Sequence, residues 1–346
     1  MGKFWVGGAT GFLGSHVVQC LLADGHDVVA VARGGGSVHG IPVKSVDVLD
    51  ENAVLASARG VDGAFLATGK VSRDAADAEE LHRVNVHGVR HALRGLRGAA
   101  VKRVVYASTS GTVAISKDPD VATEDSEEPL ELIQKWPYYR TKRYGEMEAL
   151  EANAPPDFEV VIVNPSLLLG PGDLRESSTG DVRKFLEGEI LALPRGGLAM
   201  VDVRDAARAM VSALSRGVPG ERYLLSAANL SMHAFFDRLE RLSGVPAPKF
   251  PLPKSSSFAA GLTRLFGEVV EKVGGELPMD EVSVEMAQHY WYCDSQKAID
   301  ELGFSPRDPN ATLRDTVLDL VERGVAHPRV GHHAPGGGAS ELSGSP

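Results

Sequence analysis

The sequence predicts an α/β protein in which a doubly wound parallel sheet is joined to a smaller, mostly helical C-terminal part. Apolar, strand-like runs alternate with helical periodicities through the first half, and a glycine-rich turn follows the first run. Beyond residue 172 the pattern loosens into shorter helices. Such alternation is typical of parallel sheets covered by helices on both faces. We expect a sheet domain at 1–172, a lid region at 173–329 with some segments returning to the sheet, and a tail at 330–346.

The first element is a short apolar strand at residues 3–6, which runs into Gly8-Ala9-Thr10-Gly11-Phe12-Leu13-Gly14 and a helical pattern over Phe12–Ala23. Gly8 permits a tight turn, Gly11 lets backbone approach a pyrophosphate, and Gly14 allows close packing of helix on strand. The unpaired N–H groups and positive dipole end of the helix favour a phosphate. A strand, a glycine turn and a helix in this order predict dinucleotide binding.

The later elements follow the same alternation. Helices are expected at 79–96 and 137–151, and strands at Asp27–Ala32, 42–46, 63–67, 101–107 and 158–163. In the helix at 79–96, apolar residues recur every three or four positions, so one face packs on the sheet. The tail at 330–346 mixes Gly, Ser and Pro with little apolar surface and is expected to be disordered.

Composition narrows the function. The net charge of −10 and the pI near 5.6 argue against nucleic-acid and anionic-membrane binding, because no basic stripe replaces phosphate counterions. Cys20 and Cys293 lie far apart, which indicates neither a disulfide framework nor a metal site. No signal-peptide pattern and no apolar run of roughly 18 residues are seen. We therefore expect a cytoplasmic protein without a membrane span.

Two patterns carry candidate chemistry. Tyr138 and Lys142 share one face of the helix at 137–151, where an ammonium can stabilise a phenolate and bring the tyrosine pKa toward neutrality. Such a tyrosine can protonate a carbonyl oxygen while hydride arrives from a nicotinamide. Ser108, Thr109 and Ser110 end the strand at 101–107, where parallel strands place ligands. Alone, the Tyr-x-x-x-Lys spacing is common on exposed helix faces, and a run of hydroxyls is common in polar turns. Here the glycine turn, the hydroxyls and the Tyr-Lys pair occur in this order along the chain, which favours a shared active site.

With these motifs the chain resembles the extended short-chain dehydrogenases/reductases, the NAD-dependent epimerase/dehydratase superfamily, over Lys3 to about Glu322. The resemblance is greatest to the dihydroflavonol reductase and 3β-hydroxysteroid dehydrogenase branch, and to bacterial proteins labelled hopanoid-associated sugar epimerases. It implies a Rossmann sheet with a substrate-binding lid. The matching stretches are 8–14, 84–88, 108–113, 138–142, 163–166, 170–171, 201–205 and 291–306.

The resemblance implies roles for these residues. Tyr138 would be the acid/base, and Lys142 would hold the nicotinamide ribose and lower the tyrosine pKa. The catalytic hydroxyl is Thr109 by comparison with flavonoid reductases and Ser110 by comparison with galactose epimerases. Asn85, Asp202 and Asp205 would be structural. The implied cofactor contacts are Gly8, Thr10, Gly11, Phe12, Leu13, Gly14, Asp47, Val48, Ala67, Thr68, Lys142, Pro165 and Leu168.

Two stretches depart from the family pattern. Gly7 stands where a threonine hydroxyl commonly braces the glycine loop, so the loop is expected to be more mobile. The loop at 69–74 is more charged than the apolar stretch expected there. Its Lys70 and Arg73 are either solvated charges or an anion-binding feature of the substrate site.

Arg33 points to the cofactor. NAD-binding relatives generally place an acid after the second strand, whereas here Arg33 follows and the next acid is Asp47. A cation at this position suits a 2′-phosphate, so we expect a preference for NADP(H), with NAD(H) as the other possible cofactor. The alternative interpretation is that Arg33 is an exposed loop residue without a role in binding. We expect an NADPH-preferring carbonyl reductase or alcohol dehydrogenase that acts on a small or medium, partly apolar substrate. The resemblance is also compatible with a homodimer. The alternatives are a sugar-nucleotide epimerase or dehydratase holding NAD and a non-catalytic NADP(H)-binding regulator.

Overall fold

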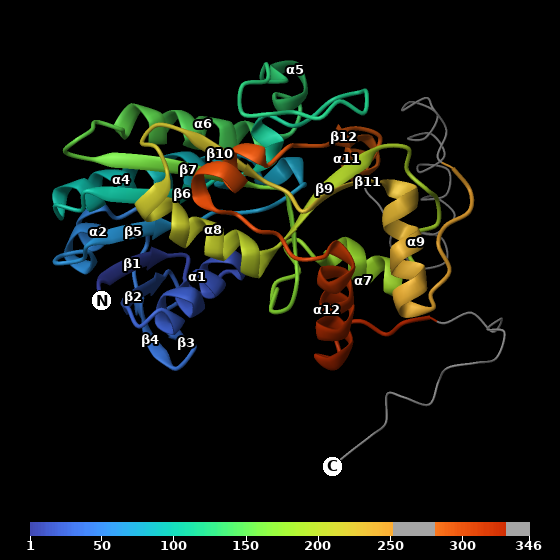
Figure 1. Ribbon diagram of the computed structural model, residues 1–346, viewed down its shortest axis with the longest axis horizontal. Coiled ribbons are helices and arrows are strands. Elements are labelled where there is room, and N and C mark those ends of the chain that lie inside the picture. Colours follow the sequence, from blue (N-terminus) through green and yellow to red (C-terminus); the bar gives the residue numbers. More distant parts are fainter. Residues whose placement is uncertain (252–280, 330–346) are drawn as a thin grey trace, which may run out of the picture.

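A computed structural model describes residues 1–251 and 281–329 (Figure 1). The expected tail at 330–346 lies outside these ranges. An eight-stranded sheet has the order β10-β7-β6-β5-β1-β2-β4-β3, and every pairing except that of β3 with β4 is parallel. The predicted α/β class with a doubly wound sheet is confirmed. The strands are β1 (Lys3–Gly7), β2 (Asp27–Ala32), β3 (Gly36–Val38), β4 (Ile41–Ser45), β5 (Gly63–Leu66), β6 (Arg103–Ala107), β7 (Glu159–Pro165) and β10 (Arg222–Leu225).

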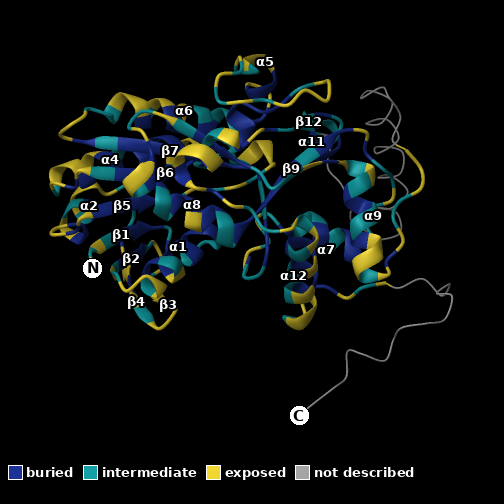
Figure 2. Cartoon of the chain, viewed as in Figure 1, coloured by how far each residue is buried: buried dark blue, intermediate teal, exposed yellow. Residues whose placement is uncertain are grey.

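Helices cover both faces of this sheet, and the strands between them are coloured largely as buried residues (Figure 2). On one face lie α1 (Phe12–Ala23) and α8 (Val203–Arg216), which pack on each other. On the other face lie α2 (Glu51–Ser57), α4 (Gly88–Gly98) and α6 (Pro137–Ala152). Within the described ranges, no helix combines the length and apolarity needed to cross a bilayer.

The helix expected at 79–96 is interrupted by a π-helical turn. It consists of α3 (Ala78–His82), the π turn (Arg83–His87) and α4. Asn85 sits in this turn, where its side chain donates to Lys70 O at 3.0 Å and to Thr141 Oγ1 at 3.2 Å and accepts from Lys70 N at 2.8 Å. The wider turn therefore lets Asn85 fasten α6 to the loop after β5, which is the structural role expected of it.

The C-terminal part contains strands that the periodicity did not predict. Four short strands form a second sheet in the order β11-β9-β12, with β8 also paired to β9: β8 (Leu167–Leu169), β9 (Gly197–Asp202), β11 (Ala228–Ser231) and β12 (Tyr290–Trp291). Around them lie α5 (Leu130–Ile133), α7 (Gly180–Leu186), α9 (Met232–Ser243), α11 (Glu281–Met286) and α12 (Pro309–Glu322). β8 and β12 have only three and two residues, too few for alternation to be recognised, and β9 and β11 do not alternate strictly between apolar and polar residues.

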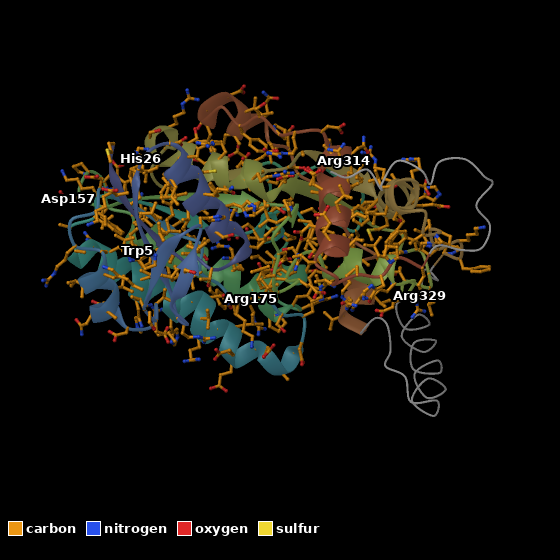
Figure 3. The ribbon with its side chains drawn as sticks, turned by 90° about the horizontal axis from the view of Figure 1, so that it is seen from below. Trp5, His26, Asp157, Arg175, Arg314 and Arg329 are labelled. Carbon is orange, nitrogen blue, oxygen red and sulfur yellow. The ribbon has the colours of Figure 1, made fainter. Side chains whose placement is uncertain are left out.

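Trp5 explains the glycine at position 7. The indole is wholly buried inside the sheet domain (Figure 3), and its Nε1 donates to Ser57 Oγ at 2.9 Å. Gly7 lies two residues along the same strand face, and a Cβ there would come within 2.6 Å of two indole carbons. A threonine at this position therefore collides with Trp5. The loop is braced by its backbone instead, since Gly11 N donates to Gly8 O at 2.8 Å.

Gly7→Thr is expected to destabilise the fold by about 1–3 kcal/mol, because it overpacks a filled core. Urea unfolding measures the change. In a Trp5→Leu background, which opens the space, the same substitution should cost less than in the wild type. An equal cost in both backgrounds would contradict the steric explanation.

Candidate active site

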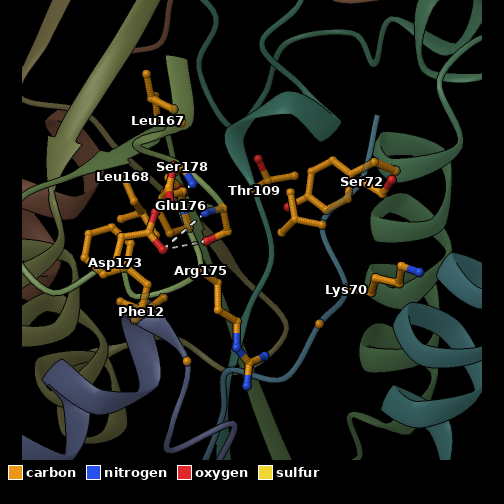
Figure 4. A pocket seen from close by; sticks show the side chains of 18 of the residues that line it. Phe12, Lys70, Ser72, Thr109, Leu167, Leu168, Asp173, Arg175, Glu176 and Ser178 are labelled. Atoms are coloured by element: carbon orange, nitrogen blue, oxygen red, sulfur yellow. Dashed lines mark hydrogen bonds between the residues drawn. The ribbon is translucent and has the colours of Figure 1, made fainter. Parts of the chain in front are cut away.

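A cleft of about 1470 Å³ opens at the carboxyl ends of β1, β5, β6 and β7 (Figure 4). The chain leaves β1 for β2 on one side and later returns to β5 on the other, so this edge is a topological switch point where ligands bind in open α/β sheets. The structure brings together here every predicted site residue except Gly14: Gly8, Thr10, Gly11, Phe12, Leu13, Arg33, Asp47, Val48, Ala67, Thr68, Thr109, Ser110, Tyr138, Lys142, Pro165 and Leu168.

The glycine turn has the shape that its residues predict. Gly8 adopts φ +76°, in the left-handed region that favours glycine. Gly14 faces away from the cleft toward the Gly8 carbonyl, which a Cβ at position 14 would overlap. Gly14 therefore lets α1 pack against the turn, and Gly11 at the N-cap leaves the first turn of the helix facing the cleft.

Helix α6 carries Tyr138 and Lys142 into the cleft. Pro137 begins the helix, which directs Tyr138 and Lys142 to the same side one turn apart. The Lys142 side chain is nearly inaccessible, with 4% of the residue exposed, and its Nζ donates to Ala107 O at 2.7 Å and to Tyr106 OH at 3.1 Å. Both partners belong to β6, so the ammonium is held against the end of that strand.

Burial moves the pKa values of both groups away from their ordinary ranges. It lowers the pKa of Lys142 to about 8, because the charged form is desolvated, while the nearby charge of Glu146 opposes this change. Burial also raises the pKa of Tyr138, since the phenolate would be desolvated. Tyr138 is thus a neutral phenol at neutral pH, able to donate a proton. The tyrosine pKa is not lowered by Lys142 in this arrangement, because the ammonium is directed to β6.

The three consecutive hydroxyls after β6 have different surroundings. Thr109 lines the cleft, and its Oγ1 accepts from Gly111 N at 3.3 Å, which begins a short 3₁₀ turn. Ser110 also lines the cleft but is more enclosed than Thr109, with 5% of the residue exposed. Ser108 Oγ is buried without a hydrogen-bond partner among the described residues.

Several buried polar atoms of the cleft also lack partners within the described ranges. They are Thr68 Oγ1, Ser108 Oγ, Trp136 Nε1 and Ser166 Oγ. A buried polar group left without a partner costs about 1–3 kcal/mol, so these atoms suit a cleft that receives a polar ligand. Their hydroxyls and the exposed glycine backbone fit a nicotinamide dinucleotide. In the same ranges, no group of three or more His, Cys, Asp or Glu side chains could hold a metal ion.

At the other end of the cleft, Arg33 follows β2 with 73% of its side chain exposed. Its Nη1 lies 4.0 Å from Glu80 Oε1, and Glu80 is held more tightly by Arg83, whose Nε and Nη2 donate at 2.7 and 2.8 Å. Asp47 lines the cleft nearby and accepts from Leu49 N at 3.0 Å. Glu80 was not among the residues predicted for this site. The one signal in the sequence was an acidic residue on the polar face of the helix expected at 79–96.

The charged loop after β5 is fastened by ion pairs. Lys70 Nζ contacts Asp77 at 2.6 Å, and Arg73 contacts Asp181 of α7 at 2.7 and 3.1 Å. Arg73 also donates to Ser283 of α11 at 3.2 Å. The loop therefore joins the sheet domain to two C-terminal helices across the cleft.

Glu146 is a second residue that the sequence analysis missed. It is wholly buried, and its Oε1 accepts from Thr112 Oγ1 at 2.8 Å and from Asn164 Nδ2 at 2.6 Å. Its position, four residues after Lys142 and eight after Tyr138, places all three on one helix face. The sequence could have indicated Glu146 as a site residue, because an acidic side chain is unusual on the helix face that packs against the sheet.

Comparisons with known proteins agree with this geometry. Residues 5–226 match the model of the NAD dependent epimerase/dehydratase family. A putative dihydroflavonol 4-reductase of Synechocystis sp. is 32% identical over 333 residues, covering 92% of this chain and 93% of that protein. Cinnamoyl-CoA reductase 1 of Oryza sativa is 32% identical over 63% of this chain and 69% of its own.

Solved structures give the same answer. A nucleoside-diphosphate-sugar epimerase from Pseudomonas aeruginosa is 26% identical and superimposes with a TM-score of 0.73 over 94% of this chain and 99% of its own. A dTDP-glucose 4,6-dehydratase from Streptomyces venezuelae, 22% identical, shares the fold with a TM-score of 0.72 over 94% and 98% of the two chains. The chain belongs to the NAD-dependent epimerase/dehydratase family and is an NAD(P)-dependent enzyme of the extended short-chain dehydrogenase/reductase type.

Proposed function

We propose that this protein is an NADPH-preferring reductase that converts the carbonyl of a small or medium substrate to an alcohol. The observation that carries the proposal is the convergence of Tyr138, Lys142 and Thr109 with the glycine turn in one cleft. The similarity to proteins named dihydroflavonol 4-reductase and cinnamoyl-CoA reductase supports it.

In this mechanism a bound nicotinamide nucleotide supplies the hydride. The backbone N–H groups at the start of α1 would bind its diphosphate, and Lys142 would hold the ribose beside the end of β6. Tyr138 would give its proton to the carbonyl oxygen as the carbonyl carbon is reduced, and solvent would then reprotonate the phenolate. The Lys142 Nζ donates to Ala107 O and Tyr106 OH, so its ammonium would have to turn toward Tyr138 to stabilise that phenolate.

Thr109 is the hydroxyl proposed to orient the carbonyl oxygen. It is partly exposed to the cleft, and its Oγ1 keeps its proton free because it accepts from Gly111 N. Ser110 is buried, with 5% of the residue exposed, so its hydroxyl is less accessible to a substrate than that of Thr109. A positioned donor of this kind stabilises charge that develops on the oxygen.

Arg33 supports the NADPH preference. An exposed ion pair is worth at most about 1 kcal/mol, so Glu80 at 4.0 Å holds Arg33 weakly, and a 2′-phosphate competes well for the guanidinium. Glu80 itself is occupied by Arg83.

A sugar-nucleotide epimerase or dehydratase is the second candidate. The cleft, at about 1470 Å³, has room for a nucleotide-linked sugar beside a dinucleotide, and two of the structural neighbours carry such activities in their names. The two candidates differ in how the nucleotide is held. An epimerase returns the hydride to its own substrate, whereas a reductase must release the oxidised cofactor every cycle.

We expect the purified protein to be largely free of nucleotide, or to carry exchangeable NADP(H), and to oxidise added NADPH when offered aldehydes or ketones. Denaturation followed by chromatography identifies any nucleotide, and absorbance follows a carbonyl panel. Arg33→Asp should remove the preference for NADPH over NADH. Stoichiometric, non-exchanging NAD without NADPH consumption would favour the epimerase instead.

Tyr138→Phe should lose at least about 100-fold in kcat while binding NADPH nearly as the wild type does, because only the transferable proton is removed. Single-turnover rates and fluorescence titration measure the two effects. Tyr144→Phe, on an exposed face of the same helix, is the matched control and should change neither. Retention of more than a tenth of the activity by Tyr138→Phe would exclude Tyr138 as the proton donor.

The lowered pKa of Lys142 predicts a basic limit to activity. Its ammonium is charged below pH about 8 and becomes neutral above, whereas Tyr138 keeps its proton because burial raises its pKa. We therefore expect kcat/KM and NADPH affinity to fall as the pH rises through about 8. Lys142→Arg keeps its charge and should retain NADPH affinity above that pH. The same decline in the arginine variant would assign the limit to another group.

A further inference from the structure

We propose that Arg175 is a second cationic contact for the cofactor, facing its diphosphate from the loop that lies against the start of α1. This inference rests on the proposed dinucleotide binding. It concerns a residue that the sequence motifs did not single out, on the loop between β8 and α7 (residues 170–179).

The loop that carries Arg175 is anchored by a buried carboxylate. Asp173 is almost wholly inaccessible, and it accepts hydrogen bonds from the backbone N–H groups of Ser177, Ser178 and Thr179 at 2.8 to 3.2 Å. The hydroxyls of Ser177 and Thr179 donate to it as well, at 3.1 and 3.2 Å. With five donors on one carboxylate, the loop has a defined shape, so the side chain at position 175 projects from a fixed base.

Arg175 itself has no fixed partner. Its side chain is exposed and lines the cleft, and it forms no hydrogen bond or ion pair within residues 1–251 and 281–329. The neighbouring acid, Glu176, is turned away: it adopts φ +52° and accepts from Arg183 Nε at 2.6 Å. Because Arg183 occupies Glu176, the guanidinium of Arg175 is left to meet an anion that enters the cleft.

The loop lies against the start of α1. A Cβ at Gly172 would come within 3.4 Å of His16 Cε1, and His16 Nδ1 lies 2.9 Å from Phe12 O in the first turn of that helix. Figure 4 shows the Arg175 side chain directed down the cleft, between the helix that carries Phe12 and the segment that carries Lys70. In Figure 3, Arg175 lies in the middle of the molecule, between the half with Trp5 and the half with Arg329.

Two positive features therefore border the same space. One is the N-terminal end of α1, whose free N–H groups and dipole favour an anion, and the other is the guanidinium of Arg175. A diphosphate between them would receive backbone hydrogen bonds on one side and a charge-assisted, planar contact on the other. The residues assign Arg33 to the 2′-phosphate and Arg175 to the diphosphate, so their contributions are separable by ligand.

The test measures dissociation constants by calorimetry for four probes: NADPH, NADH, ADP-ribose and adenosine 2′-monophosphate. Arg175→Ala should weaken NADPH, NADH and ADP-ribose alike, by about 10-fold, since each carries the diphosphate and a charge-assisted hydrogen bond is worth at least about 1.5 kcal/mol. It should leave adenosine 2′-monophosphate unchanged. Arg33→Ala should do the reverse, weakening the two probes that carry a 2′-phosphate.

Two further variants keep the result interpretable. Leu174→Ala changes an adjacent exposed side chain without charge and should leave all four constants unchanged. Arg175→Lys should recover part of the lost affinity. Unaltered ADP-ribose binding in Arg175→Ala overturns the assignment while leaving the reductase proposal standing, and so does a higher KM for the carbonyl with unchanged nucleotide affinity. A wild-type protein that binds none of the four overturns the dinucleotide site itself.

Discussion

The buried carboxylate of Glu146 is the contact on which the reacting end of the cleft depends. Thr112 and Asn164 donate to it, and Asn164 Nδ2 also donates to Thr109 O at 3.0 Å, so α6, the turn after β6 and β7 meet at one point. Leaving one of these buried donors without its acceptor would lower the stability of the fold by about 1–3 kcal/mol, so the three elements are held together. The same negative charge lies one helical turn from Lys142 and moderates the fall in its pKa. One side chain thus joins three elements of the site and partly offsets the effect of burial on the pKa of Lys142.

The parts of this structure that the sequence predicted are those governed by local rules. The turn from Gly8 to Gly14 needs residues without a Cβ, and Tyr138 and Lys142 meet because helix geometry places them one turn apart. Other features depend on distant partners. The π turn at Asn85 exists because its amide reaches Lys70 and Thr141, and Gly7 is required by Trp5. The strand Tyr290–Trp291 pairs with β9, and Tyr290 also forms a bridge with Ser116, pairings that no local pattern reveals.

The cleft is lined by several cationic side chains, although the whole chain carries a negative net charge. The protein carries a net charge of −10, yet Arg33, Lys142 and Arg175 all line the cleft together with the positive end of α1. The acids that border it are largely occupied: Asp173 by its own loop, Glu80 by Arg83 and Glu176 by Arg183. A local positive field surrounded by negative surface concentrates an anionic ligand at one place and disfavours it elsewhere.

The two ends of the cleft differ in their access to water, and this difference bears on the chemistry. Lys142 is 4% exposed, so charges there interact in a poorly solvated environment where hydrogen bonds to a developing oxyanion are strong. Arg33 has 73% of its side chain exposed, so its contacts with a phosphate form and break against competition from water. In the proposed reductase, the proton would move at the dry end and the adenosine end of the cofactor would be held at the wet end, an arrangement compatible with release of the cofactor after each turnover.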